Sequence, residues 1–525
     1  MARIILNMNK KFQDKIADIQ QSKADENDES WKEHQFWYVK YKIQNDKEII
    51  DNNSINQKKL CEFLYANGFR RYNINEVTIF IQIQNKIVKV VEVHHIQDFV
   101  FDWIDGLPYY LDEHELFSKD MLIEKLLKSI GTYFNEQKLY YLRSKEEIIW
   151  HKDTLNEKYF YFQNGYVTVT KDKINFNSYD DLPDCIWNDQ ILPRDFQLTN
   201  KKLITPVEQF FYLVSNSDVN RFKDLKIITG YYLHNYFDYK LRSVLITDST
   251  ISEDDESNGR SGKTLWGKLI SAMISGNGNN TENKSFVEIN GKEFKPEEKD
   301  KYQSCSHNTQ VVMINDLKKN FDVDHVYNDV TEGIMVKLLY KQVFRIYVKM
   351  ILTTNKTIRI TGDSSRDRFI EFEFSNYFNA THSPEKEFGH WFFRDWNKQQ
   401  WLAFDTFMIN CVKEFFANNK ELNKPDMINL NVRKLREQTS LEFVEYMEQI
   451  WKPNHNEWYK FQVRYKLFTE MYPDYTKLKE KTFADWIKLF MKYSPIYKDF
   501  KKSDMHRRTA EGTEYRFIKV EYENI

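Results

Sequence analysis

Short, nearly continuous apolar runs alternate with longer stretches of helical spacing over the middle of the chain. The runs lie at 243–247, 310–314, 348–354 and 369–374. Apolar runs of this length are typical of strands buried on both faces, and their alternation with helices is typical of a mostly parallel sheet. We therefore expect an α/β core over residues 239–385.

The part of the chain before this core has a different pattern. Residues 77–91 and 159–169 each contain two strand-like stretches around a short polar turn. Such patterns favour β-hairpins, and the helical spacing between them indicates an α+β domain. We predict this domain over residues 57–200, preceded by a polar tail or loose helix over residues 1–56.

Helix-forming stretches precede and follow the core. They predict a helical connector or collar at 201–238, a helical linker at 386–430 and a small helical unit at 431–525. The last unit ends in an aromatic and apolar stretch at 515–520, which fits the strand of a winged helix. The chain is therefore predicted to end in a winged-helix-like domain.

The composition is that of a globular protein with several domains. Its 525 residues are 41% apolar and 16% aromatic, which is enough to form more than one core. No stretch approaches the roughly 18 apolar residues of a membrane span, and the start lacks the apolar centre of a signal peptide. The four cysteines are too far apart for a zinc or redox motif. We expect reduced thiols, no membrane partner and a cytoplasmic location, in a bacterial cell or, if virus-encoded, in its host.

Net charge limits how the chain could bind nucleic acid. The formal charge is -2, so phosphate contacts would need local basic patches rather than an overall positive surface. One such patch lies at 458–525, where 15 Lys and Arg stand against 10 Asp and Glu. This excess, interleaved with aromatic residues, fits phosphate contact by the last domain.

A glycine-rich stretch follows the first apolar run of the core. It reads Gly259, Arg260, Ser261, Gly262, Lys263, Thr264 and leads into helical spacing. Glycines let backbone N–H groups curl around an anion, and the side chains of Lys263 and Thr264 can reach phosphate and Mg²⁺. The order of strand, loop and helix is the context that a phosphate loop needs. Gly-Lys-Thr also occurs by chance, and Ser257 stands where the strict pattern has glycine.

Polar residues at the ends of the later strands extend this pattern. Asp316 can orient the water shell of Mg²⁺, and Asn355 can position a water beside a γ-phosphate. Arg368, with Arg366 in reserve, can act as an arginine finger, which adds about 10³ to 10⁵ in rate. Taken singly, a helix cap, a turn residue and a surface ion pair would explain these residues. Their order along one stretch favours a nucleotide-driven motor.

With these motifs the sequence resembles superfamily 3 helicases, specifically the helicase half of phage and plasmid primase-helicases and their poxvirus-type relatives. The family's first motif resembles 259–264, its second 313–316 and its third the strand that ends at Asn355, and its arginine matches Arg368. The resemblance covers roughly residues 60–520. It implies an AAA+-like P-loop core with a parallel sheet, an α+β domain before it and a winged helix after it.

The resemblance also implies an activity. It implies an ATP hydrolase and DNA helicase that uses ATP and Mg²⁺ during replication of a phage, plasmid or other mobile element. Lys263, Asp316, Asn355 and Arg368 would be the catalytic residues, and Thr264 and Asp316 would hold the metal. The finger requires a homo-oligomeric ring, expected as a hexamer, because one subunit cannot complete its own site.

DNA contacts follow from the same resemblance. The family carries a hairpin between its second and third motifs that holds single-stranded DNA in the ring. Lys337 and Lys341 occupy that place, so both are candidate contacts to single-stranded DNA or a forked duplex. An ordinary pair of solvated lysines is the alternative interpretation.

Some residues depart from the family pattern. Asn315 stands where many relatives have a second acid, and the acidic run 253–256 precedes the anion site. Asp98, Asp102 and Asp105 have helical spacing rather than the clustering that a primase needs, so no primase activity is expected. Two other functions remain open: an ATP-dependent replication initiator that binds DNA without unwinding it, and a nucleotide-regulated defence scaffold.

Overall fold

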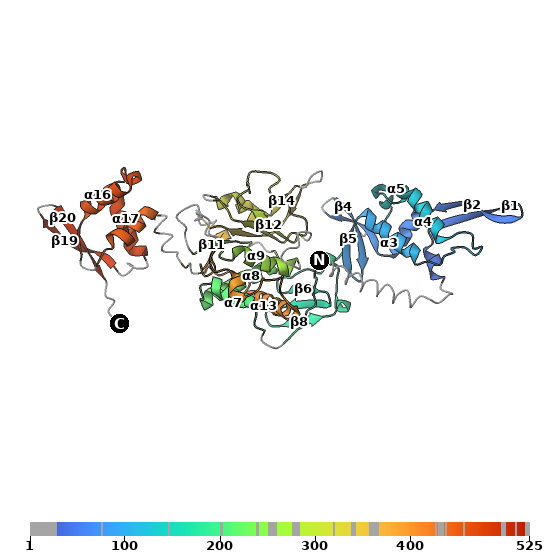
Figure 1. Ribbon diagram of the computed structural model, residues 1–525, viewed down its shortest axis with the longest axis horizontal. Helices are drawn as coiled ribbons and strands as arrows, with labels where there is room; N and C mark the ends of the chain where they lie inside the picture. The colour runs from blue at the N-terminus through green and yellow to red at the C-terminus, as the bar shows by residue number, and fades with distance from the viewer. Residues whose placement is uncertain are drawn as a thin grey trace.

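The computed structural model describes most of the chain between residues 29 and 519, and the described residues form three regions, each with a hydrophobic core (Figure 1). The described ranges are 29–74, 77–144, 147–199, 203–237, 241–249, 260–275, 284–318, 321–337, 343–355, 367–425, 428, 435, 438–454, 457–494, 500–509 and 512–519.

The N-terminal region combines a mixed sheet with helices that cover one of its faces. Strands β3, β4 and β5 are antiparallel neighbours, and β9 (Ile186–Trp187) joins β5 in parallel. The expected hairpin at 77–91 forms, with positive φ at its two turn residues, Asn85 and Lys86. The elements are η1 (Ser30–His34), β1 (Trp37–Gln44), β2 (Lys47–Ile55), α2 (Gln57–Ala66), β3 (Phe69–Ile74), β4 (Val77–Gln84), β5 (Ile87–Val91), α3 (Val93–Asp105), α4 (Lys119–Lys128), α5 (Ile130–Tyr133) and α6 (Glu136–Leu139).

The central region is built on the expected parallel sheet. Its strands lie in the order β12-β13-β16-β11-β17, and each neighbouring pair is parallel. Most strand residues are buried, as is usual when both faces of a parallel sheet are covered. Because the strands are parallel, the loops that follow them leave from one edge of the sheet. The strands are β11 (Ser243–Asp248), β12 (Phe286–Asn290), β13 (Val311–Asn315), β16 (Lys349–Thr353) and β17 (Phe369–Phe374).

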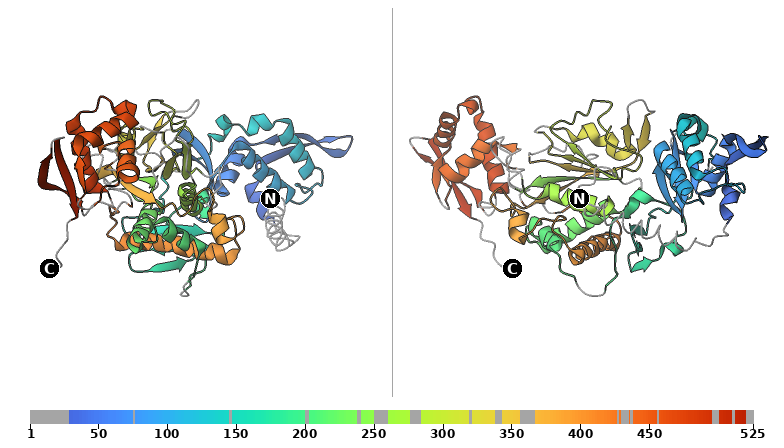
Figure 2. Two further views of the ribbon diagram at one scale, coloured as in Figure 1. Left: turned by 60° about the vertical axis from the view of Figure 1, so that its left-hand side comes forward. Right: turned by 45° about the vertical axis from the view of Figure 1, so that its right-hand side comes forward.

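Helices cover one face of this sheet, and a hairpin with irregular segments covers the other (Figures 1 and 2). Val244 and Ile246 of β11 point into the helix-covered core, whereas Leu245 points into the other, as strand alternation requires. The helices are α7 (Pro206–Val214), α8 (Val219–Leu233), α9 (Lys263–Ile274) and α13 (Lys398–Ala417), and the other face has η4 (Val323–Val326), α10 (Tyr327–Glu332), β14 (Ile334–Val336) and β15 (Phe344–Ile346).

The stretches expected as a connector and a linker both supply helices to this core. Helices α7, α8 and α13 place their buried side chains in the same cluster as α9 and the sheet. At Gly230 of α8, a Cβ atom would lie 2.2 Å from the carbonyl oxygen of Cys411 in α13. The two helices therefore pack so closely that only glycine fits at this position.

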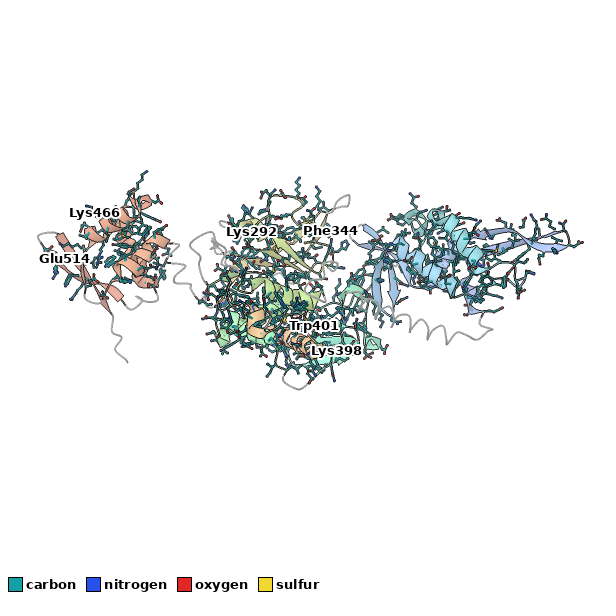
Figure 3. All side chains as sticks on the ribbon, in the orientation of Figure 1. Lys292, Phe344, Lys398, Trp401, Lys466 and Glu514 are labelled. Carbon is teal, nitrogen blue, oxygen red and sulfur yellow. The ribbon has the colours of Figure 1, made fainter. Side chains whose placement is uncertain are left out.

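A smaller sheet in the order β10-β6-β7-β8 packs against the same helices. Phe162 and Val167 of this sheet share the core with α13, and Arg194 pairs with the buried Asp405 at 2.7 Å. The guanidinium of Arg194 also lies 4.5 Å from the ring of Trp401. Trp401 and Lys398 lie near the start of α13 (Figure 3). The sequence placed the stretch 158–196 in the N-terminal domain, and the structure divides it. Ile186 joins β5 of the N-terminal sheet and packs in a separate cluster, whereas other apolar side chains of the stretch share the central core, namely Phe160, Phe162, Val167, Val169, Leu192 and Phe196. The strands are β6 (Lys158–Phe162), β7 (Gly165–Val169), β8 (Ile174–Asn177) and β10 (Ile191–Leu192).

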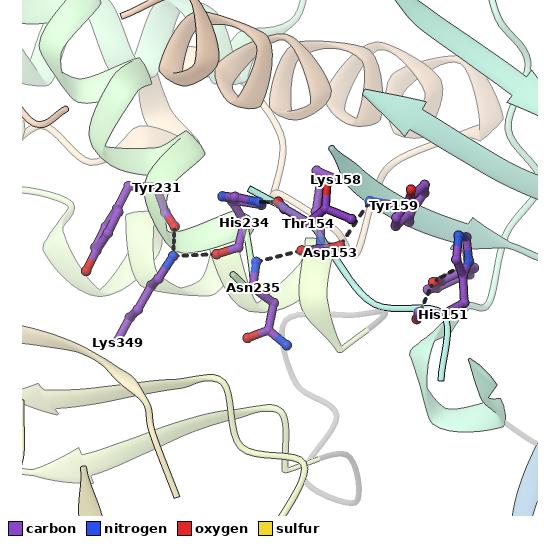
Figure 4. Close-up of polar contacts among 10 residues, drawn as sticks. His151, Asp153, Thr154, Lys158, Tyr159, Tyr231, His234, Asn235 and Lys349 are labelled. Atoms are coloured by element: carbon purple, nitrogen blue, oxygen red, sulfur yellow. Dashed lines mark hydrogen bonds and ion pairs between the residues drawn. The ribbon is translucent and has the colours of Figure 1, made fainter. Parts of the chain in front are cut away.

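A buried polar network ties this smaller sheet to the amino end of the parallel sheet (Figure 4). His234 Nε2 donates to the carbonyl of Thr154 at 2.8 Å, and Asp153 accepts from Lys158 at 3.0 Å. The ammonium of Lys349 donates to the carbonyls of Tyr231 and His234. Burial, with the charge of Lys349, lowers the pKa of His234 to about 4, so its ring is neutral near pH 7.

The C-terminal region is a helical unit with a small antiparallel sheet in the order β18-β20-β19. Its core is strongly aromatic and includes Phe443, Phe468 and Phe483. The elements are α15 (Leu441–Glu445), the π-helical turn η5 (Tyr446–Trp451), β18 (Trp458–Lys460), α16 (Phe461–Met471), α17 (Glu480–Tyr493), β19 (Phe500–Thr509) and β20 (Gly512–Lys519).

All four cysteines are buried thiols without a disulfide. Within the described ranges, none of the helices has the length and apolar character required to cross a membrane.

Candidate functional site

A cleft of about 850 Å³ opens at the carboxyl edge of the parallel sheet. The start of α9 forms one wall, and the residues that end β13 and β16 form the floor. A segment after β17 forms the opposite wall with His390, Trp391, Phe392 and Arg394. Clefts beyond the carboxyl ends of parallel strands are the usual ligand sites of such sheets.

Gly262 begins the wall at α9 because no other residue fits its conformation. Its φ is +99°, in the left-handed region that favours glycine. A Cβ atom at this position would lie 2.7 Å from the ring of Phe210 in α7. Gly262 therefore lets α9 start directly at the cleft, where its first N–H groups and its partial positive charge favour an anion.

Lys263 is the first residue of α9, and its ammonium lies inside the cleft wall. The Nζ atom lies 2.5 Å from Asp248 Oδ2, donates to Asn355 Oδ1 at 2.5 Å and lies 3.3 Å from Ser261 Oγ. Burial lowers the pKa of Lys263, while the carboxylate of Asp248 raises it. A buried ammonium with three oxygen partners can exchange one of them for an oxygen of a bound anion such as phosphate.

Asn315 connects the helix to the ends of two strands. Its Nδ2 donates to Thr264 Oγ1 at 3.1 Å and to Glu288 Oε1 at 2.7 Å, and its Oδ1 accepts from Thr353 at 2.6 Å. The hydroxyl of Thr353 in turn accepts from the backbone N–H of Asp316 at 2.9 Å. Asn315 therefore orients the hydroxyl of Thr264 by donating a hydrogen bond to it. An ionised carboxylate at position 315 would have no hydrogen to donate.

Asp316 lies at a tight turn after β13. Its φ is +64°, and its carboxylate pairs with Lys292 at 2.8 Å. The turn packs on Gly291, where a Cβ atom would lie 2.8 Å from the carbonyl oxygen of Asn315. The hydrogen bond to Asp316 raises the pKa of Lys292. Asp316 and Thr264 thus present carboxylate and hydroxyl oxygens to one cleft.

These oxygen donors fit Mg²⁺ in the way that a nucleotide site requires. Among the described residues, no group of three His, Cys, Asp or Glu side chains could hold a metal ion unaided. Mg²⁺ is commonly bound by one or two protein oxygens together with phosphate oxygens and water. Thr264 and Asp316 would therefore be the protein ligands of a Mg²⁺ ion if a nucleotide supplied the other oxygens.

The structure brings together some predicted site residues and separates others. Arg260, Ser261, Gly262, Lys263, Thr264, Asp316 and Asn355 line the cleft. Arg368 precedes β17, so it lies at the amino edge of the sheet, opposite the cleft. A strand of this length spans roughly 20 Å at ~3.3 Å per residue. The candidates Gly259, Arg366 and Lys341, and the residues at 253–257, lie outside the described residues.

Lys337 follows β14 in the hairpin that covers the other face of the sheet, and it is exposed. Gly333 starts this hairpin with a φ of +83°, and a Cβ there would lie 2.5 Å from the carbonyl oxygen of Ile346. Arg345 lies on β15 and Tyr347 follows it. Both side chains are exposed, that of Tyr347 to 52%. In this hairpin the sequence had indicated only Lys337 and Lys341 as candidate DNA contacts.

Sequence reasoning also missed Asp248 and Trp391. Asp248 ends β11, so a search for polar residues at every strand end would have found it. Trp391 is 50% exposed beside the cleft, with Arg394 5.5 Å from its ring. No local signal marks Trp391, because its position depends on how the segment after β17 folds back over the sheet edge.

The chain was compared with known families, sequences and structures. It matches no protein-family model and no curated protein. Among solved structures it is similar to the A form apo structure of the NrS-1 C-terminal region, with a TM-score of 0.36 and 10% sequence identity over 88% of this chain and 99% of that chain. A second apo structure of that region gives a TM-score of 0.34 and 12% identity over 89% and 99% of the two chains.

Proposed function

We propose that this chain is a ring-forming, ATP-dependent DNA helicase of superfamily 3 that translocates on single-stranded DNA. The observation that carries the proposal is the convergence of Lys263, Asp316 and Asn355 in one cleft at the start of α9. These residues come from three separate stretches of the chain. Helix caps, turns and surface pairs would explain each residue alone, but they give no reason for all three to meet.

The strand order supports an AAA+-like P-loop core. Strand β11, the first along the chain, lies between β16 and β17, and the chain after it continues to the far edge of the sheet at β12. In a parallel sheet, a crevice forms where the connection after one strand goes to one side and the connection after the neighbouring strand goes to the other side. Ligands commonly bind in this crevice. The carboxyl end of β11, at Asp248, lies at this point.

The side chains support a division of roles in ATP hydrolysis. Lys263 would leave Asp248 for a phosphate oxygen, and the N–H groups at the start of α9 would hold the same phosphates. Thr264 and Asp316 would hold Mg²⁺, which when bound supplies positive charge to the phosphate oxygens. Asn355, already within hydrogen-bonding distance of Lys263, would position the attacking water and respond to loss of the γ-phosphate.

The position of Arg368 supports a ring. It lies at the amino edge of the sheet and Lys263 lies at the carboxyl edge, so the two cannot meet within one subunit. An arginine there can complete only the site of a neighbour. We propose a homo-oligomer, expected as a hexamer, in which Arg368 reaches the adjacent cleft.

Two surfaces support the DNA contact. The β14-β15 hairpin presents Lys337, with Arg345 beside it, and would hold single-stranded DNA. In the C-terminal region, Arg507 and Arg516 lie 4.7 and 5.1 Å from the ring of Trp458. We propose that this region is a winged-helix-like domain and that the protein acts in the cytoplasm during replication of a phage, plasmid or other mobile element.

The test is unwinding of a forked duplex that carries no special sequence. The full chain should hydrolyse ATP faster with single-stranded DNA and separate the fork, and Lys263→Ala should lose both activities. Lys398→Ala, at the start of α13 and outside the cleft, serves as the control. Hydrolysis without unwinding would instead support an initiator, and binding without turnover would support a scaffold; either result would overturn the proposal.

A further inference from the structure

A cluster of arginines and tyrosines lies at the β3 edge of the N-terminal sheet, away from the cleft of the central region. Strand β3 is the edge strand, and the segment at 143–144 runs along it through a bridge between Arg71 and Ser144. Arg70 and Arg71 come from β3, and Arg143 comes from this segment. Two distant parts of the chain thus bring three guanidinium groups to one edge.

Two of these guanidinium groups share one tyrosine ring. The Cζ atoms of Arg70 and Arg143 lie 3.3 and 5.4 Å from the ring centroid of Tyr65, at the end of α2. Arg70 is held in place because its Nη1 donates to the carbonyls of Tyr65 and Phe69, at 2.5 and 2.7 Å. Its position is therefore set by the fold rather than by a neighbouring acid.

The arginines are not neutralised within the part of the chain that the structure describes. No described carboxylate lies within ion-pair distance of Arg70, Arg71 or Arg143, and strands β3, β4 and β5 contain no acidic residue. Burial lowers the pKa of Arg70, and the charge of Arg143 lowers it further. Like charges held this close repel each other, and a bound anion would relieve the repulsion.

One exposed aromatic ring lies next to these charges, and a second belongs to the following residue in the chain. The guanidinium of Arg71 lies 5.8 Å from the ring of Tyr140 and donates to its carbonyl at 3.0 Å. Tyr140 is 43% exposed, and the next residue, Tyr141, is 74% exposed. Large aromatic side chains are usually buried, so two consecutive exposed rings beside a cationic cluster indicate a contact surface.

We propose that this edge, formed by Tyr65, Arg70, Arg71, Tyr140, Tyr141 and Arg143, binds single-stranded nucleic acid. The guanidinium groups would contact successive phosphates, and the exposed tyrosine rings would stack on bases. Unpaired bases offer their faces for stacking, whereas the bases of a duplex are already stacked on each other. An acidic protein segment would satisfy the charges but gives no role to Tyr141. This surface is separate from the nucleotide cleft, so its binding does not require ATP.

The test is fluorescence anisotropy of the full chain with a labelled oligothymidine of about 20 nucleotides, without nucleotide triphosphate, in the Lys263→Ala background. Tyr141→Ala should weaken binding about 5-fold or more, the size of a lost stacking contact. Arg143→Ala should weaken binding and reduce the salt dependence of log K by about 0.7, as expected for one lost phosphate contact. Both side chains are exposed, so neither change should affect folding.

Matched controls come from the same region. Tyr109→Ala removes a tyrosine that is 54% exposed, and Lys47→Ala removes an exposed cation from the β1-β2 hairpin. Both should bind like the parent chain. If Tyr141→Ala and Arg143→Ala also bind like the parent chain, or if a duplex of equal length binds as tightly as the single strand, the proposal is wrong. Because the background lacks Lys263, the result is independent of whether the chain hydrolyses ATP.

Discussion

The ammonium of Lys263 lies 2.5 Å from the carboxylate of Asp248, so the lysine that we propose as a phosphate ligand is already paired within the same chain. Both side chains are about 8% exposed. A buried ion pair that loses one partner leaves an uncompensated charge, which costs about 3–5 kcal/mol. In the proposed function, Asp248 and a phosphate oxygen would be alternative partners for this one cation.

Asp248→Asn should lower the stability of the chain without nucleotide and enlarge its stabilisation by ATP. The amide keeps an oxygen for Lys263 but removes the charge, so we expect a loss of about 1–3 kcal/mol. Bound phosphate should restore most of this loss. Thermal unfolding with and without a non-hydrolysable ATP analogue measures both effects, and Asp367→Asn, at an exposed pair with Lys424, is the control. An unchanged shift with the analogue would argue against exchange of partners.

Arg368→Ala and Lys263→Ala should each lose ATP hydrolysis, and a mixture of the two variants should recover part of it. Mixed rings contain some interfaces in which an intact Lys263 faces an intact Arg368, because the two residues belong to different subunits. Loss of a finger lowers the rate by about 10³ to 10⁵, so the recovered activity should stand well above that of either variant. Steady-state hydrolysis at equal total protein measures it. Normal hydrolysis by Arg368→Ala alone would show that the finger is another residue.

Gly262→Ala should abolish nucleotide binding and destabilise the central region. The residue has a φ of +99°, and the added methyl group would meet the ring of Phe210 at 2.7 Å. A strained backbone costs about 1–3 kcal/mol, before the shift of Phe210 is counted. Gly131→Ala is the matched control because its Cβ would meet no atom within 4 Å and it lies in α5. Binding of a fluorescent ATP analogue and thermal unfolding are the measurements, and equal behaviour of the two variants would contradict the prediction.

Stability should fall as the pH decreases from about 6.5 toward 4, because His234 is neutral in the fold. Burial, assisted by the charge of Lys349, lowers the pKa of His234 from 6.5 to about 4. Between these two pH values the unfolded chain binds a proton at this histidine, whereas the folded chain does not. The stability that the neutral histidine contributes is present above about pH 6.5. About 2 kcal/mol of unfolding free energy should be lost by pH 5. Urea unfolding at pH 7.5 and pH 5 measures the loss.

His234→Gln isolates this histidine from the others. The amide can still donate to the carbonyl of Thr154, but it does not titrate. The difference in unfolding free energy between the two pH values should therefore be smaller in the variant, although His151, whose pKa is also lowered by burial, still contributes. An equal pH dependence in both chains would mean that His234 is not responsible.

The local pattern was sufficient for much of the central fold. The apolar runs predicted four of the five strands of the parallel sheet, because strands buried on both faces are recognised by their continuous apolar character. The edge strand β12 is only partly buried and was not predicted. The glycine-rich stretch predicted the start of α9 for a similarly local reason, because Gly262 alone tolerates the backbone conformation there. Asp316 and Asn355 were found from their places after apolar strands, and Lys263 from the Gly-Lys-Thr motif.

Helix packing was beyond the reach of such patterns. Helices α8 and α13 were expected as connectors, yet they meet at Gly230 and Cys411 in the central core. The smaller sheet likewise joins that core through the pair of Arg194 and Asp405. Helical spacing shows that a face is apolar but not which neighbour will cover it, because that depends on contacts between distant segments.

By itself the sequence determined four strands of the parallel sheet, the glycine at the start of α9 and the polar residues that follow β13 and β16, because each depends on a few neighbouring residues. It missed β1 and β2, which lie in the stretch expected as a tail or loose helix. Only the tertiary structure decided that Asp248 and Asn355 meet at Lys263, and that Arg368 lies at the opposite edge. The order of strands decides both facts. The strand order depends on which helices and segments pack on each face of the sheet. Those contacts join residues that lie far apart in the chain.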